Sequence, residues 1–244
     1  MKKSWDVRAY VDLFAGAGRA RIKGTPRIVP TSAMLALGVR DPFDSYVLCE
    51  IDPGRLEALE QRARRDAPGR TVRCILGDCN ENVARILAEI PAPGRNRRVL
   101  GLCVVDPYRL AGLRFSTVEA LAARFMDFLV LVPSYMDAHR NLEVYLDPSS
   151  RTLDEFLGNP AWRNAWAEAS VAPGPREFGA FVVDSFGRAM KRLGYLYDGP
   201  GEEVPVRDKS LLLYHLCFFS RNELGRKFWR EARRYSLDQL DLFS

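Results

Sequence analysis

Residues Tyr10 to Arg19 read YVDLFAGAGR, a short apolar run that closes on an acidic residue and then on two glycines one residue apart. This pattern is typical of a buried strand that ends at a ligand. The backbone must turn sharply after Leu13, and residues without a Cβ let it approach a bound molecule closely. Gly16 and Gly18 are such residues. A G-x-G pair alone also occurs in purely structural turns, so the interpretation depends on the rest of the chain.

Strand-like and helix-like segments alternate through the first half of the chain, which predicts an α/β fold with a parallel sheet covered on both faces. Apolar runs predict strands at Arg8–Leu13, Ser45–Glu50, Val72–Leu76, Val99–Val105 and Phe128–Val132. Apolar residues at helical spacing predict helices at Arg55–Arg65, Asn82–Ile90 and Thr117–Phe125.

The second half departs from this alternation. We expect a helical insertion at about residues 135–170, in which Trp162 and Trp166 face the core, and an amphipathic helix at Phe178–Leu193. An antiparallel hairpin should follow, with Tyr195–Tyr197 and Leu211–Phe219 on either side of a Gly/Pro/Glu turn at Gly199–Val204. A basic helix at Asn222–Arg234 and a flexible tail at residues 236–244 complete the expected order.

Composition bounds the class of protein. The chain has 244 residues, 47% of them hydrophobic and 27% charged, which predicts one globular domain, residues 1–244. Charged residues interrupt the N-terminus before an apolar segment reaches signal-peptide length, and no run could span a bilayer, so we expect a cytoplasmic protein without membrane attachment. The net charge of +5 indicates either an anionic partner such as nucleic acid or a solvated arginine-rich surface.

Cysteines and histidines do not predict a metal site. The five cysteines are odd in number and lack C-x-x-C spacing, so we interpret them as reduced core thiols. The only histidines, His139 and His215, do not lie at ligand spacing from a cysteine. His215 lies in an apolar run, which favours a satisfied core histidine over a catalytic base.

Four predicted strands are followed by a carboxylate, in the order Asp12, Glu50, Asp78 and Asp106. The carboxyl ends of the strands converge on the ligand crevice of an open α/β sheet, so these side chains should line one edge. A carboxylate after the second strand can accept both hydroxyls of a ribose, and one after the third can accept an adenine amino group. Together they predict a nucleoside pocket, with Asp52 as a rival of Glu50 for the ribose.

This order of motifs resembles the class I S-adenosylmethionine (SAM)-dependent methyltransferases. The resemblance implies a Rossmann-like fold, with a mostly parallel seven-stranded sheet that closes with a C-terminal antiparallel hairpin. More narrowly, four segments resemble the three-Cys-motif partner family, methyltransferase-like proteins encoded beside a three-cysteine, radical-SAM-like protein. These segments read YVDLFAGAGR, CEID, VVDPYRL and LLLYHLCFFSRNELGRKFW.

The resemblance implies SAM as the cofactor and assigns roles to particular residues. Gly16 and Gly18 would contact its methionine part, Glu50 its ribose and Asp78 its adenine. The rest of the implied cofactor-binding set is Asp12, Phe14 and Cys79. The sequence departs from the family pattern after Gly18, where residues 19–30 read as a basic, Pro-containing loop before Thr31 or Ser32 can cap a helix.

Asp106, Pro107 and Tyr108 resemble the D-P-P-Y signature of amino-group methyltransferases and are the candidate catalytic residues. In that signature, an acidic or amide side chain and a backbone carbonyl accept hydrogen bonds from the nucleophilic nitrogen. Here the second proline is missing, and Arg109 stands where an aromatic residue would stack on a base. Methyl transfer to an exocyclic amine of nucleic acid is therefore one prediction, and Asp106 as a simple turn cap is the alternative.

The C-terminal tail carries a separate hypothesis. Gln239, Leu240, Leu242 and Phe243 resemble the short peptide with which bacterial proteins bind the replication sliding clamp. The alternative is that Leu242 and Phe243 fold back onto the domain.

Three functions remain open at this point. The first is a SAM-dependent methyltransferase acting on nucleic acid. The second is a partner that binds a nucleoside or only its three-cysteine neighbour protein. The third, dinucleotide oxidoreduction, is disfavoured because the G-x-G-x-x-G fingerprint would need a glycine at Arg21.

Overall fold

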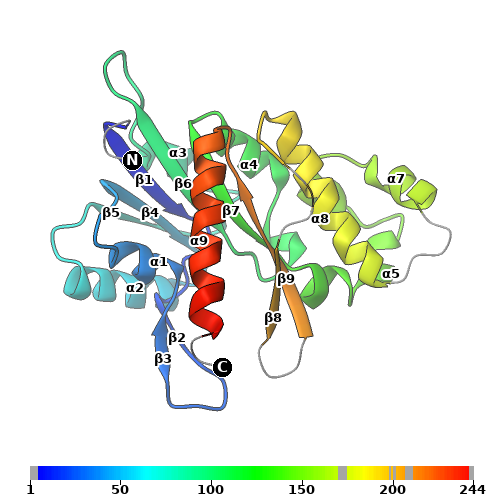
Figure 1. Cartoon of the computed structure of the whole chain (residues 1–244), viewed down its shortest axis with the longest axis horizontal. Helices are drawn as coiled ribbons and strands as arrows, with labels where there is room; N and C mark the ends of the chain where they lie inside the picture. Colours follow the sequence, from blue (N-terminus) through cyan, green and yellow to red (C-terminus); the bar gives the residue numbers. More distant parts are fainter. Residues whose placement is uncertain (1–4, 170–174, 198, 200–201, 207–210, 242–244) are drawn as a thin grey trace. The chain divides into compact units, whose positions relative to one another are not determined.

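In the computed structural model, β1 (Val7–Asp12) pairs in parallel with β4 (Ser45–Glu50) on one side and β6 (Val99–Val105) on the other. A further strand, β5 (Val72–Leu76), pairs in parallel with β4, which gives the order β5-β4-β1-β6 (Figure 1). Numbered along the chain this order is 3-2-1-4, that of Rossmann dinucleotide-binding sheets. Every residue of β4 is buried, as expected for a strand covered on both faces. The predicted α/β fold with a mostly parallel sheet is confirmed.

The structure describes residues 5–169, 175–197, 199, 202–206 and 211–241. The chain divides into two compact units, Met1–Met126 and Asp127–Ser244. Each unit is described by itself below.

The helices of the first unit follow the predicted alternation with the strands. They are α1 (Ser32–Leu37), α2 (Pro53–Asp66), α3 (Val83–Glu89), the short 3-10 helix η1 (Leu110–Gly112) and α4 (Phe115–Ala122). Asp52 caps α2, because its Oδ1 accepts a hydrogen bond from the Arg55 amide at 2.8 Å and Pro53 occupies the first helical turn. This cap gives Asp52 a structural role at the start of α2.

The segment between Gly18 and α1 differs from the predicted loop. It forms an antiparallel hairpin of β2 (Arg19–Arg21) and β3 (Ile28–Pro30). Gly24, with φ of 79°, allows the chain to reverse between the two strands. Thr31 is the N-cap of α1 as expected, but its side chain makes no capping hydrogen bond. Prolines favour a loop, but Pro30 is tolerated here because it lies at the end of an edge strand.

In the second unit, β9 (Leu211–Phe219) lies between β7 (Met126–Val132) and β8 (Glu202–Val206) and is antiparallel to both. The predicted C-terminal antiparallel hairpin is therefore confirmed, but its first arm was wrongly placed at Tyr195–Tyr197. Tyr195 belongs to the core instead, where it is 2% exposed and packs edge-on against Phe128. Residues 202–204, assigned to the turn from sequence, belong to β8.

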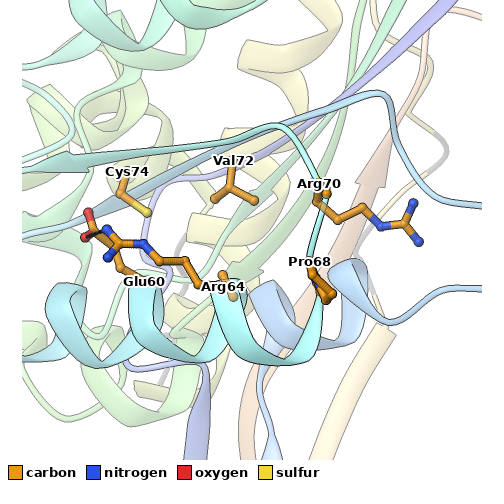
Figure 2. Close-up of a pocket in the computed structure, with 9 residues that line it drawn as sticks. Glu60, Arg64, Pro68, Arg70, Val72 and Cys74 are labelled. Atoms are coloured by element: carbon orange, nitrogen blue, oxygen red, sulfur yellow. Dashed lines mark hydrogen bonds and ion pairs between the residues drawn. The ribbon is translucent and has the colours of Figure 1, made fainter.

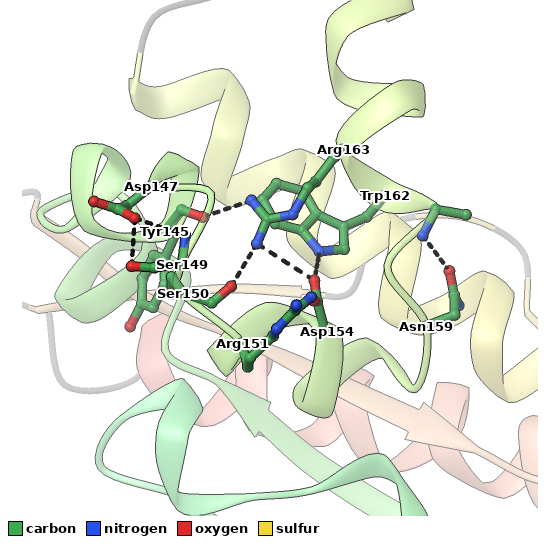
Figure 3. Close-up of polar contacts among 10 residues, drawn as sticks. Tyr145, Asp147, Ser149, Ser150, Arg151, Asp154, Asn159, Trp162 and Arg163 are labelled. Carbon is green, nitrogen blue, oxygen red and sulfur yellow. Dashed lines mark hydrogen bonds and ion pairs between the residues drawn. The ribbon is translucent and has the colours of Figure 1, made fainter.

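The helical insertion is confirmed within the second unit. It comprises the π-helix η2 (Ser134–Ala138), α5 (Leu142–Leu146), α6 (Thr152–Leu157) and α7 (Trp162–Ala169). Trp162 and Trp166 are buried as predicted. Figure 3 shows how polar groups bind these short helices together. The indole of Trp162 donates to Asp154 at 2.8 Å, and the guanidinium of Arg163 donates to the carbonyl groups of Tyr145 and Ser150 at 3.2 and 2.5 Å.

His215 lies in β9 and is buried, with its Nδ1 2.7 Å from the Ser134 hydroxyl. The prediction of a satisfied core histidine is confirmed. Four of the five cysteines are also buried as predicted, whereas Cys74 is half-buried.

The last two helices are α8 (Pro175–Arg192) and α9 (Glu223–Asp241). The final helix is longer than predicted and includes residues 236–241 of the expected flexible tail, because neither glycine nor proline interrupts the sequence there. Gln239 and Leu240 are therefore helical, while Leu242 and Phe243 lie outside the described residues. Among the described residues, we found no helix of the length and apolarity needed to cross a membrane.

Candidate functional site

The loops at the carboxyl ends of the parallel strands are held together by backbone hydrogen bonds. The Leu13 amide donates to the carbonyl of Val104 at 3.1 Å, so the turn after β1 continues alongside β6. On the other side, the Ala15 amide donates to the carbonyl of Cys49 at 2.9 Å. These bonds fix the G-x-G turn between the ends of β4 and β6, which is the position that a Rossmann sheet uses for its ligand.

A cavity of about 420 Å³ opens at this edge of the first unit, a volume within the usual range for small-molecule sites. Seven of the ten residues proposed from the sequence line it: Phe14, Gly16, Glu50, Asp78, Cys79, Asp106 and Tyr108. The lining also includes seven residues outside that set: Leu13, Ile51, Arg55, Gly77, Arg109, Ala111 and Gly112. Asp12, Gly18 and Pro107 were proposed but do not line the cavity.

Glu50 is buried at the end of β4, with both carboxylate oxygens engaged. Oε2 accepts a hydrogen bond from the Gly16 amide at 2.8 Å, and Oε1 accepts one from the Asp52 amide at 2.9 Å. A carboxylate offers about four acceptor positions, so Glu50 keeps capacity for a ligand hydroxyl while it fixes the glycine turn. Glu50 therefore stabilises the glycine turn and also lines the cavity.

Asp78 follows β5 and is held by Asn80, a residue that the sequence analysis did not identify. Its Oδ1 accepts hydrogen bonds from the Asn80 amide at 2.7 Å and from the Asn80 side chain at 2.8 Å. The same Asn80 amide group donates to the Gly112 carbonyl at 3.0 Å, while its Oδ1 accepts from the Arg114 amide and the Thr117 hydroxyl, both at 2.8 Å. Asn80 thus links the loop after β5 to the loop after β6 and sets one wall of the cavity.

Asp106 lies at the end of β6 on an exposed part of the cavity wall, and its carboxylate accepts no hydrogen bond within the described part of the chain. Partial desolvation by the surrounding wall raises its pKa above the ordinary value. Tyr108 is 70% exposed, and the guanidinium of Arg109 lies 5.8 Å from its ring centre. Pro107 is buried beneath them, close to Gly112. Asp106 and Tyr108 therefore remain accessible to a ligand.

Asp12 differs from the other three strand-end carboxylates. It is fully buried, and its oxygens accept hydrogen bonds from the Ser32 hydroxyl at 2.7 Å, the Tyr10 hydroxyl at 3.1 Å and the Phe14 amide at 3.2 Å. Burial raises the pKa of Asp12, whereas the three hydrogen bonds lower it. The effect of burial is larger, so the pKa rises to about 6. The structure places Asp12 behind the cavity, where it joins the end of β1 to α1.

The two glycines of the G-x-G pair have different surroundings. Gly16 has φ of 61°, and a Cβ built on it meets no atom within 4 Å, which fits a residue that borders open space. Gly18 has φ of 78°, and a Cβ there would lie 2.7 Å from Met34 Cγ and 2.8 Å from Leu59 Cδ1. Gly16 therefore borders the cavity, whereas the absence of a side chain at Gly18 allows α1 and α2 to pack closely on the turn.

The residues at the cavity that the sequence analysis did not identify have only weak sequence patterns. Ile51 follows Glu50 and is 67% exposed on the cavity wall, which is unusual for a large apolar side chain and could have been suspected from its place after a strand-end carboxylate. Arg55 and Arg109 bring positive charge to the same cavity. Asn80 had no distinguishing pattern in the sequence, because its role depends on a loop that lies more than thirty residues further along the chain.

A second cavity of about 330 Å³ lies between α2 and the edge strand β5. Figure 2 shows Glu60, Arg64 and Cys74 at one end and Pro68 and Arg70 at the other. Arg64 is paired with Glu60 at 3.0 Å, and burial raises the pKa of the Cys74 thiol to about 12, which makes it a poor nucleophile. This cavity therefore lacks the free catalytic groups of the first one.

Comparisons with known proteins show distant structural likeness. No protein-family model matches the sequence, and no curated protein matches it. Trm1 from Pyrococcus horikoshii, solved as a complex with S-adenosyl-L-methionine, is 11% identical, with a TM-score of 0.47 over 91% of this chain and 53% of that chain. Protein LPL1258 from Legionella pneumophila is 14% identical, with a TM-score of 0.42 over 66% of this chain and 69% of that one. Because these TM-scores are below 0.5, the assignment of the fold rests on the strand order.

Proposed function

We propose that this protein is a SAM-dependent methyltransferase that acts on nucleic acid. One observation carries the proposal: carboxylates from the ends of three parallel strands, Glu50, Asp78 and Asp106, line one cavity beside the Gly16 turn. A nucleoside with a positively charged centre suits this set of groups, because carboxylates accept hydroxyl and amino hydrogen bonds and also stabilise positive charge.

The lining residues fit the parts of SAM. Glu50, with unused acceptor capacity, would hold the ribose hydroxyls, and the second oxygen of Asp78 would accept from the adenine amino group. Ile51 offers an exposed apolar surface to the face of the adenine ring. Arg55 and Arg109 supply guanidinium groups of the kind that bind a carboxylate such as that of the methionine part.

When bound, SAM supplies a methyl group on a sulfonium centre, ready for in-line displacement. Asp106 would accept a hydrogen bond from the attacking amine and direct its lone pair, and its raised pKa suits it to take up the proton that the amine releases. Tyr108 offers an exposed ring on which a base could stack. The rate advantage would come mainly from orientation rather than from a strong base.

The test is a calorimetric titration of the full chain with SAM, and with NAD as the control ligand. Loss of a charge-assisted hydrogen bond costs about 1.5–3 kcal/mol, so Glu50→Gln should weaken SAM binding roughly 10- to 150-fold. Asp52→Ser is the matched control, because it removes a neighbouring carboxylate while keeping a capping oxygen on α2. Absence of SAM binding by folded wild-type protein would contradict the proposal.

A second candidate function is a partner protein that binds a nucleoside without transferring a methyl group. The altered D-P-Y motif favours it, because Arg109 stands beside Tyr108 where the signature has an aromatic residue. The three-cysteine, radical-SAM-like protein is then the proposed partner. SAM binding without turnover on any nucleic acid, together with co-purification of that neighbour, would favour this candidate over the first.

A further inference from the structure

The hairpin formed by β2 and β3 is the most exposed ordered element of the first unit. Every residue from Arg19 to Pro30 is exposed apart from Val29, which is half-buried. Figure 1 shows the hairpin extending away from the sheet of its own unit. Ile22 and Ile28 are 39% and 55% exposed, so the hairpin adds little to the hydrophobic core. Stability of the sheet therefore does not account for this element.

The base of the hairpin is firmly held. The Thr31 amide donates to the Gly18 carbonyl at 2.9 Å and closes the two strands. Arg19 forms an ion pair with Asp66 at 2.8 Å, and the Arg62 side chain donates to the Ala17 carbonyl, so both contacts tie the base to α2. The hairpin is thus fixed at the end nearest the cavity, three residues after Gly16.

The turn of the hairpin is also defined by its own hydrogen bonds. The Ile22 amide donates to the Arg27 carbonyl at 2.9 Å, and the Thr25 amide donates to the Ile22 carbonyl at 3.0 Å. The Thr25 hydroxyl accepts from the Arg27 amide at 3.2 Å. A preformed element of this kind loses less conformational entropy on binding than a flexible loop does.

Charge is concentrated on this segment. The chain contains 31 acidic residues among 244, about one in eight, yet none lies between Leu13 and Arg40. Arg21, Lys23 and Arg27 are exposed, and none has a carboxylate partner in the part of the chain that the structure describes. In the register of the hairpin Arg21 pairs with Ile28, so cationic and apolar groups share one face. Exposed cations on a rigid ribbon fit the phosphates of a nucleic acid.

We propose that the β2–β3 hairpin binds double-stranded DNA by entering its major groove. The major groove of B-form DNA is about 12 Å wide and admits a two-stranded ribbon, whereas the deep, narrow major groove of A-form RNA does not admit protein elements. The inference rests on the proposed function in one respect: the fixed base of the hairpin beside Gly16 would bring the bound duplex to the cavity. Arg21, Lys23 and Arg27 contact phosphates, and Ile22 covers sugar and base edges.

The experiment measures binding of the full chain to a fluorescent 20-base-pair DNA duplex by anisotropy over a range of salt concentrations. The hairpin variant carries Arg21→Gln, Lys23→Gln and Arg27→Gln. Each lost phosphate contact lowers the slope of log affinity against log salt by about 0.9, so the loss of three contacts should lower affinity roughly 500-fold at 0.1 M salt, relative to a 1 M reference. The control variant carries Arg70→Gln, Arg95→Gln and Arg97→Gln, which removes three exposed cations elsewhere on the same unit.

The outcomes separate the inference from the proposed function. Wild-type affinity in the hairpin variant, or an equal loss in the control variant, overturns the inference. Equal or tighter binding of an RNA duplex of the same sequence overturns the choice of DNA. The hairpin variant should keep SAM binding. If wild-type protein binds duplex DNA through the hairpin but binds no SAM, the docking inference stands and the proposed methyl transfer fails.

Discussion

The ends of β1 and β6 carry the same residue type at the same edge of one sheet, but in opposite environments. Asp12 is fully buried, and three groups of its own chain donate hydrogen bonds to it. Asp106 is exposed in the cavity and accepts no hydrogen bond from any residue that the structure describes. A carboxylate whose acceptor positions are used by the protein serves the fold, whereas one that is left open can serve a ligand. Position along a strand does not distinguish the two; the donors around the carboxylate do.

Substitution at Asp106 should give the largest effect. Removing a group that orients the reacting amine costs of the order of a hundred- to a thousandfold in rate, so Asp106→Ala should lower kcat by that factor and leave the affinity for SAM nearly unchanged. Transfer of a labelled methyl group from SAM to duplex DNA measures the rate. Asp12→Asn is the matched control and should keep transfer within a few-fold per folded molecule. Equal losses in both variants would remove the functional distinction between the two carboxylates.

The burial of Asp12 should make the free energy of unfolding depend on pH. Its pKa is about 6 in the folded protein, against an ordinary aspartate value of 3.8, so the folded state holds the proton more tightly than the unfolded chain does. Asp12 therefore stabilises the fold most below pH 3.8, and that contribution is lost as the pH rises through 6, by about 3 kcal/mol in total. Urea unfolding should show that the free energy of unfolding of the wild type decreases from pH 4 to pH 7. The decrease should be smaller in Asp12→Asn. Some decrease in the free energy of unfolding should remain in Asp12→Asn, because burial also raises the pKa of Asp127 to about 6 and this residue is unchanged in the variant. An unchanged pH dependence in the variant would argue against this account of Asp12.

The two glycines of the turn extend the comparison to the backbone. Gly18→Ala combines a positive φ with close contacts to Met34 and Leu59, so it should lower the free energy of unfolding by about 2–3 kcal/mol. Gly16→Ala has the same backbone cost but no contact within 4 Å, so its effect on stability should be about 1 kcal/mol, with a separate loss of SAM affinity. Thermal unfolding and SAM titration of both variants measure the two effects. The assignment fails if the Gly16 variant is the less stable of the two.

The sequence predicted much of this arrangement. Periodicity located the parallel strands and their helices, because near-continuous apolar runs such as Tyr46–Cys49 are strong signals. It misplaced the first arm of the late hairpin, because Tyr195 reads as a strand residue although packing against Phe128 makes it part of the core. The carboxylates of the cavity were found by their position after strands. Asn80 and the burial of Asp12 could not be found, because both depend on contacts between distant segments.

The single hydrogen bond between Gly18 and Thr31 also bears on how such a protein could be modified or diversify. It joins the two ends of the twelve-residue hairpin segment that contains β2 and β3. The preceding strand β1 and the following strand β4 pair with each other in the main sheet, which does not include the hairpin. A segment joined in this way can be shortened, lengthened or exchanged for another without changing the register of its neighbours. Ancestors and descendants of this chain could therefore have altered the surface beside the cavity independently of the chemistry inside it, and an engineer could graft a different recognition element at the same two residues.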